Sequence, residues 1–142
     1  MYRLPGTIML FLLLLAGAPT ADAQGTRKQG RQLEQIQSAY SSAIRWGEFE
    51  EAWQLVDPEY REAHPMTELA MERYQQVQVS GYTDRTTERT AEGSVVRNVD
   101  LRVINRHTMS ERSLRYREEW RWDPQARRWW LATGLPDFWD GQ

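Results

Sequence analysis

The chain has 142 residues, of which 40% are hydrophobic and 27% charged, and its formal net charge is −2. This composition is typical of one globular domain and excludes disordered, collagen-like and low-complexity proteins. There is no cysteine. A disulfide, a thiolate metal site and a cysteine nucleophile are therefore excluded.

Residues 1–23 have the pattern of a secretory signal peptide. Arg3 precedes an apolar run over residues 8–16, and the sequence Ala-Asp-Ala at 21–23 places small residues where cleavage occurs. The run is shorter than the roughly 20 apolar residues that a membrane-spanning helix requires. We therefore expect cleavage before Gln24, a periplasmic or secreted mature protein, and no membrane insertion after cleavage.

The first half of the mature chain has helical periodicity. Residues 24–32 are polar and contain two glycines, which predicts a flexible lead-in that becomes helical. The single domain is expected over 33–142. Its first helix extends from Leu33 to Gly47, because apolar residues recur there every three or four positions. A second stripe from Phe49 stops before Pro58, which starts an extra turn, and Thr67 caps a last short helix.

The second half alternates with period two, which indicates strands. The expected first strand covers residues 77–81, with a bulge at Gly81, and the polar residues 83–90 are expected to form a turn. Three more strands follow, over 95–103, 114–122 and 129–132. Helices followed by an antiparallel meander predict an α+β fold, in which the N-terminal helices pack on one face of a curved four-stranded antiparallel sheet.

Two stretches carry a resemblance to a known family. Residues 43–53, Ala-Ile-Arg-Trp-Gly-Glu-Phe-Glu-Glu-Ala-Trp, followed by Asp-Pro-Glu-Tyr at 57–60, resemble the opening of nuclear transport factor 2-like domains. Residues 120–131 are similar to the closing hairpin of those domains. The resemblance spans nearly the whole mature chain and implies a cone-like α+β fold. The superfamily includes SnoaL-like cyclases and ketosteroid isomerases, so the resemblance does not by itself supply an activity.

Alternation places two charges on the apolar faces of the central strands. Arg97 lies between Val95 and Val99, and Glu118 lies between Tyr116 and Trp120. We predict an ion pair between Arg97 and Glu118 in the concave interior.

The expected register leaves two arrangements open for this pair. A loop centred on Thr108-Met109 places Arg97 diagonal to Glu118, with Val99 opposite the carboxylate. A slip of two residues places Arg97 and Glu118 directly opposite. Contact across the sheet follows from either register.

This pair has a structural and a functional interpretation. It can be two buried charges that compensate each other, or the polar anchor of an apolar pocket. For the functional interpretation, the expected ligand-binding residues are Arg97, Tyr116, Glu118, Trp120 and Trp53. The leading hypothesis is a non-enzymatic exported module that binds a small apolar or anionic ligand, an envelope protein or a second copy of the chain through its concave sheet face.

The alternative is a SnoaL-like or isomerase-like enzyme with Glu118 as general base and Tyr116 or Arg97 stabilising developing negative charge. No cofactor is expected, since no glycine-rich phosphate loop occurs. No metal site is expected either, because His64 and His107 lie in loops without ligand spacing. Nucleic acid is not an expected partner, because the strand aromatics are needed for the core.

The C-terminus ends in large apolar residues. Phe138 and Trp139 are expected either to fold back over the mouth of the sheet or to form an exposed patch for another subunit. Folding back is favoured, because an exposed pair of this kind promotes aggregation.

Overall fold

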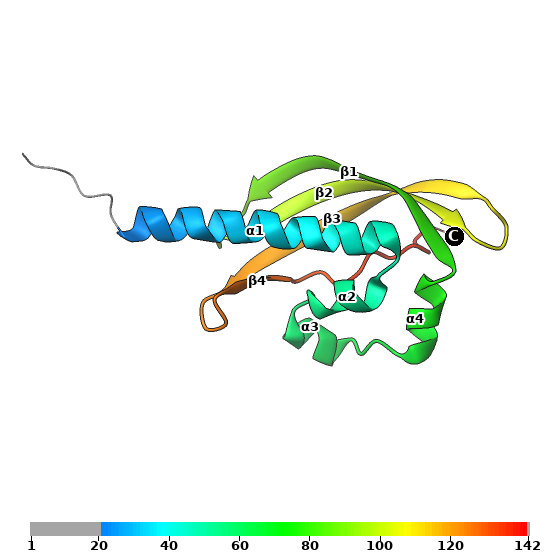
Figure 1. Cartoon of the computed structure of the whole chain (residues 1–142), viewed down its shortest axis with the longest axis horizontal. Helices are drawn as coiled ribbons and strands as arrows, with labels where there is room; N and C mark the ends of the chain where they lie inside the picture. The colour runs from blue at the N-terminus through cyan, green and yellow to red at the C-terminus, as the bar shows by residue number, and fades with distance from the viewer. Residues whose placement is uncertain (1–20, 142) are drawn as a thin grey trace, which may run out of the picture.

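The computed structural model describes residues 21–141 and has helices followed by a sheet. The helices are α1 (Ala21–Trp46), α2 (Phe49–Gln54), α3 (Pro58–Ala63) and α4 (Glu68–Tyr74). The strands are β1 (Val77–Arg89), β2 (Val95–Asn105), β3 (Glu111–Asp123) and β4 (Arg128–Leu131). They form one antiparallel sheet in the order β1-β2-β3-β4, curved and not closed (Figure 1). The α+β prediction is confirmed. The apolar run of the expected signal peptide lies outside the described residues.

Helix α1 is longer than the sequence predicted. It already includes residues 24–32, which were expected to be a flexible lead-in, and it ends at Trp46, just before Gly47, whose φ is 74°. One contact fixes this early part: the Trp129 indole Nε1 donates a hydrogen bond of 2.9 Å to the carbonyl oxygen of Gln29. The apolar stripe of α1 faces the sheet, and Tyr40 and Ile44 are completely buried. The extension at the N-terminal end therefore depends on contact with β4, which local periodicity does not reveal.

Helices α3 and α4 begin where their capping residues predict. Asp57 accepts a hydrogen bond from the backbone N–H of Glu59 at the start of α3, and Pro58 occupies the first turn. Thr67 accepts from the backbone N–H of Ala70 at 3.1 Å and caps α4. The three short helices lie together below the C-terminal half of α1 (Figure 1).

The predicted turn over residues 83–90 is wrong. Strand β1 continues through this segment to Arg89, which pairs with Val95, and the chain reverses at 90–94. The far part of β1 is exposed on both faces, so it carries no alternation of apolar and polar residues. The bulge expected at Gly81 is confirmed by a shift of register between Val79 and Gly81, and a second shift follows Asp84.

The register of β2 and β3 is the second of the two that the sequence allowed. Arg97 lies directly opposite Glu118, and Val99 lies opposite Tyr116. The side chain of Asn105 explains why this register is adopted, because its Oδ1 accepts hydrogen bonds from the backbone N–H groups of His107 and Thr108. This Asx turn moves the centre of the loop one residue toward the N-terminus.

Aromatic residues fill the space between the helices and the concave face. Trp120, Trp129, Tyr40 and Phe49 are each no more than 2% exposed. Phe138 is 1% exposed and contacts Phe49 and Tyr74 at ring-centroid distances of 5.8 and 5.5 Å. The C-terminal segment folds back onto the domain, as expected.

Candidate functional site

The predicted ion pair between Arg97 and Glu118 is present. Arg97 Nε donates to Glu118 Oε2 at 2.8 Å, and Arg97 Nη2 donates to Glu118 Oε1 at 3.1 Å. Arg97 is 6% exposed and Glu118 is 0% exposed. Two parallel N–H···O bonds are the strongest geometry for an arginine and a carboxylate. The pair therefore lies inside the domain, beneath α1.

The carboxylate of Glu118 is surrounded by hydrogen-bond donors. Besides the two bonds from Arg97, the indole Nε1 of Trp120 donates to Oε2 at 2.8 Å, and the hydroxyl of Tyr82 donates to Oε1. Each carboxylate oxygen thus accepts two hydrogen bonds, which satisfies a buried acceptor. Neither oxygen is directed at solvent.

Burial acts on both members of the pair. Desolvation raises the pKa of Glu118, and the hydrogen bond from Trp120 opposes this rise. Desolvation also lowers the pKa of Arg97. Each charged form is costly in the interior, so each depends on the other for compensation.

Tyr116 is engaged elsewhere. Its hydroxyl donates to the carbonyl oxygen of Gly134 at 2.7 Å and lies 2.7 Å from the hydroxyl of Tyr40, which therefore donates to it. Burial raises the pKa of Tyr116 and keeps the hydroxyl neutral. The hydroxyl of Tyr116 is thus committed to the backbone near the C-terminal segment, and no hydrogen bond joins it to Glu118.

The structure separates Trp53 from the other predicted site residues. Trp120 is completely buried and contacts Tyr40 edge to face at 5.5 Å. Trp53 is half-buried and packs on Tyr60 at 6.3 Å, in an apolar hollow that also contains Trp139. The predicted set of five residues therefore does not form one pocket.

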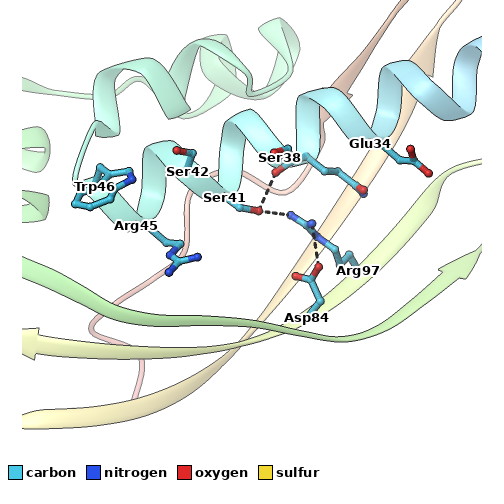
Figure 2. Close-up of a pocket in the computed structure, with 9 residues that line it drawn as sticks. Glu34, Ser38, Ser41, Ser42, Arg45, Trp46, Asp84 and Arg97 are labelled. Atoms are coloured by element: carbon cyan, nitrogen blue, oxygen red, sulfur yellow. Dashed lines mark hydrogen bonds and ion pairs between the residues drawn. The ribbon is translucent and has the colours of Figure 1, made fainter.

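An open groove lies beside the ion pair, between α1 and β1, and we name it the α1–β1 groove (Figure 2). Its volume is about 570 Å³, and Arg97 forms part of its floor. The other main lining residues are Glu34, Ser38, Ser41, Arg45, Trp46 and Asp84.

Arg97 is the residue that connects the groove with the interior. Its Nη2 donates to Ser41 Oγ at 3.0 Å, and its Nη1 makes one long contact of 3.5 Å with Asp84 Oδ2 (Figure 2). Asp84 has a side chain that is 58% exposed. One side of the guanidinium is therefore locked to Glu118, whereas the Nη1 side is weakly held and faces the groove.

Apart from Arg97, sequence reasoning missed the residues of this groove. Trp46 is 79% exposed. The signal for it in the sequence was a large aromatic residue directly before Gly47, where the helix was expected to end. Asp84 was assigned to a turn, because β1 was expected to be short. Ser41 lies beside the apolar stripe of α1, and only the tertiary packing brings it to Arg97.

Within residues 21–141, no group of three or more His, Asp or Glu side chains could hold a metal ion. His64 and His107 are exposed, and His64 stacks on Tyr60 at 4.2 Å. No helix in this part of the chain combines the length and the hydropathy that crossing a bilayer requires.

Comparisons of the chain with models of protein families and with curated proteins found no match. The function is therefore inferred from the geometry of the site.

Proposed function

We propose that the protein is an exported, non-enzymatic binding module that recognises its partner at the α1–β1 groove. The observation that carries this proposal is the position of Arg97, whose Nη1 side faces an open groove of about 570 Å³ while its other side is fixed by Glu118. A guanidinium held in one orientation by a buried partner can exchange the long Nη1 contact with Asp84 for a ligand acceptor without a further loss of side-chain entropy.

The exposed residues of the groove support the same proposal. Trp46 leaves most of its ring in solvent, and aromatic and arginine side chains are the residues that most often dominate binding energies. Ser38 and Ser42 add hydroxyl groups along the same wall. A partner with an apolar group and hydrogen-bonding groups fits this lining better than a purely apolar ligand.

The enzymatic alternative has less support. A general base must come within hydrogen-bond distance of the proton that it removes. Glu118 is 0% exposed, and four donors occupy its two oxygens. The hydroxyl of Tyr116 is bonded to Gly134.

We also propose that the chain is a divergent member of the nuclear transport factor 2-like superfamily. The curved, unclosed sheet with helices on its concave side is consistent with this assignment. In this chain, however, Trp120, Trp129 and Tyr40 fill the interior of the cone. Binding is therefore assigned to the edge of the concave face rather than to its centre.

Export is tested by determining the N-terminal residue of the mature protein. We expect the full chain, expressed in a bacterium, to be recovered from the periplasm or the medium with Gln24 as its first residue. Mass spectrometry of the purified protein measures this. Recovery of uncleaved protein from the cytoplasm would contradict export.

Binding at the groove is tested by tryptophan fluorescence during titration with small molecules and peptides. We expect a ligand that shifts the emission of the wild-type protein to lose this effect in Trp46→Phe and to keep it in the matched control Trp53→Phe. The opposite result would place the ligand in the hollow beside Trp53. A ligand recovered in chemically altered form would contradict the non-enzymatic assignment.

A further inference from the structure

The two edges of the sheet differ in whether another segment covers them. The outer edge of β4 is covered by the segment between α2 and α3. The backbone N–H of Asp57 donates to the carbonyl oxygen of Leu131 at 2.8 Å, and the N–H of Leu131 donates to the carbonyl oxygen of Leu55 at 3.0 Å. Strand β1 is much longer, and it pairs with β2 alone. Within residues 21–141, no backbone hydrogen bond joins its outer edge to another segment. Such an edge can accept a further strand.

The groove follows this open edge. A second hollow of about 300 Å³ continues from the first and shares Arg45 and Trp46 with it. Its lining includes β1 from Val77 to Ser80, whereas the first hollow meets β1 at Asp84. The two hollows together form a trough that has α1 as one wall and β1 as the other, with Trp46 in common.

The charges along the trough have an order. Arg45 and Arg106 line the end near Val77, and no carboxylate lines that hollow. Glu34 and Asp84 line the other end. Arg97 is also there, but its charge is balanced by Glu118 inside the domain. An elongated partner thus meets positive charge at one end and negative charge at the other.

We propose that the trough binds an extended peptide segment, added antiparallel to β1, which carries a basic residue and, about four residues closer to its C-terminus, an acidic residue. This inference rests on the proposed function and specifies its partner. An antiparallel segment begins at the Asp84 end, so its basic residue meets Glu34 and Asp84 and its acidic residue meets Arg45 and Arg106. The apolar residue beside the acidic one contacts Trp46, which is next to Arg45 at the end of α1.

Distances fix the spacing of the two charges. The rise of an α-helix, about 1.5 Å per residue, places Glu34 and Arg45 about 16 Å apart along α1. Four residues of an extended strand span about 13 Å at 3.3 Å each, and the long side chains cover the difference. The pairing of β1 with β2 shifts register on both sides of Gly81–Asp84, so only a short length of β1 is regular enough to pair with an added strand.

The test uses two labelled peptides of identical composition. The first is acetyl-Lys-Val-Thr-Val-Glu-amide, and the second has the reversed charge order, acetyl-Glu-Val-Thr-Val-Lys-amide. We expect the first to bind about five- to tenfold more tightly by fluorescence anisotropy at low salt, because it forms both end contacts and avoids like charges. Equal affinities would overturn the charge order.

A double substitution provides the reciprocal test. The side chains of Glu34 and Arg45 are exposed, and within residues 21–141 neither side chain makes a hydrogen bond or ion pair, so we expect Glu34→Lys with Arg45→Glu to leave the fold intact. We expect this variant to prefer the second peptide. An unchanged preference would show that the peptides bind outside the trough.

Strand addition is tested through the peptide backbone. Methylation of the amide nitrogens on one edge of the first peptide removes the donors that pair with β1, whereas methylation on the other edge does not. We expect one methylated form to lose binding at least tenfold and the other to retain it. Equal loss or equal retention would overturn strand addition.

The outcome also separates this inference from the proposed function. If neither peptide binds but another ligand produces a shift that depends on Trp46, the groove remains the binding site and the peptide proposal fails. If no ligand of any class produces such a shift, the proposed function itself fails.

Discussion

Two ion pairs in this domain use the same chemistry in different surroundings. Arg97 and Glu118 form a bidentate pair between β2 and β3 in the interior. Asp57 and Arg121 join the loop before α3 to the outer side of β3. The side chain of Arg121 is 36% exposed, whereas that of Glu118 is 0% exposed.

The pKa values change in opposite directions in the two pairs. Burial lowers the pKa of Arg97 and raises that of Glu118. Burial also acts to raise the pKa of Asp57, but hydrogen bonds from Arg121 and from the N–H of Glu59 bring it below its ordinary value. The hydrogen bond with Asp57 raises the pKa of Arg121. Desolvation prevails in the interior, and pairing prevails where water still reaches one partner.

The largest expected effect comes from removing one interior charge. We expect Arg97→Met and Glu118→Leu each to lower the free energy of unfolding by about 3–5 kcal/mol, because each leaves an uncompensated buried charge. The double variant should be more stable than either single variant. Urea unfolding followed by tryptophan fluorescence measures all three proteins. A double variant no more stable than the singles would contradict the compensation.

The next largest effect is expected from removing a buried apolar side chain. Phe138→Ala should cost about 3 kcal/mol, because the ring is buried against Phe49 and Tyr74. Deletion of residues 135–142 should destabilise at least as much. Sedimentation first establishes that each protein is monomeric, and urea unfolding then measures the loss of stability. An oligomer that dissociates without loss of stability would instead support an intersubunit role for this segment.

A smaller effect distinguishes the two interior tyrosines. Tyr116→Phe leaves the hydroxyl of Tyr40 and the carbonyl of Gly134 without a partner, so we expect a loss of about 1–2 kcal/mol. Tyr40→Phe removes only the donor to Tyr116 and should cost about half as much. Thermal unfolding of the two variants gives the comparison. Equal losses would contradict the assigned donor order.

The smallest effect is expected at the pair of Asp57 and Arg121, in which water reaches the arginine, and this effect depends on pH. Asp57→Asn keeps the cap on α3 but loses the charge, and the cost at pH 7 should be about 1 kcal/mol, since water screens Arg121.

The pH dependence follows from the lowered pKa of Asp57. Its contribution to stability is complete above the ordinary value of 3.8 and is lost as the pH falls through the lower folded value. The stability gap between the wild type and Asp57→Asn should therefore close below about pH 4. A gap that stays constant between pH 6 and pH 2 would show that the charge of Asp57 is not the cause.

The sequence by itself determined the order of helices and strands, the caps at Asp57 and Thr67 and the inward direction of Arg97 and Glu118. These features depend on neighbours within a few residues: a repeat of three or four positions, a side chain that bonds the next turn, or an alternation of faces.

Only the tertiary structure decided the full length of β1, the register of the central hairpin and the position of the groove. The outer half of β1 is held by hydrogen bonds to β2 rather than by an apolar face, so its residues carry no periodic signal. Ser41, Trp46 and Asp84 line one groove with Arg97 because α1 packs over the face of the sheet beside β1. That contact joins segments far apart in the chain, and no local pattern encodes it.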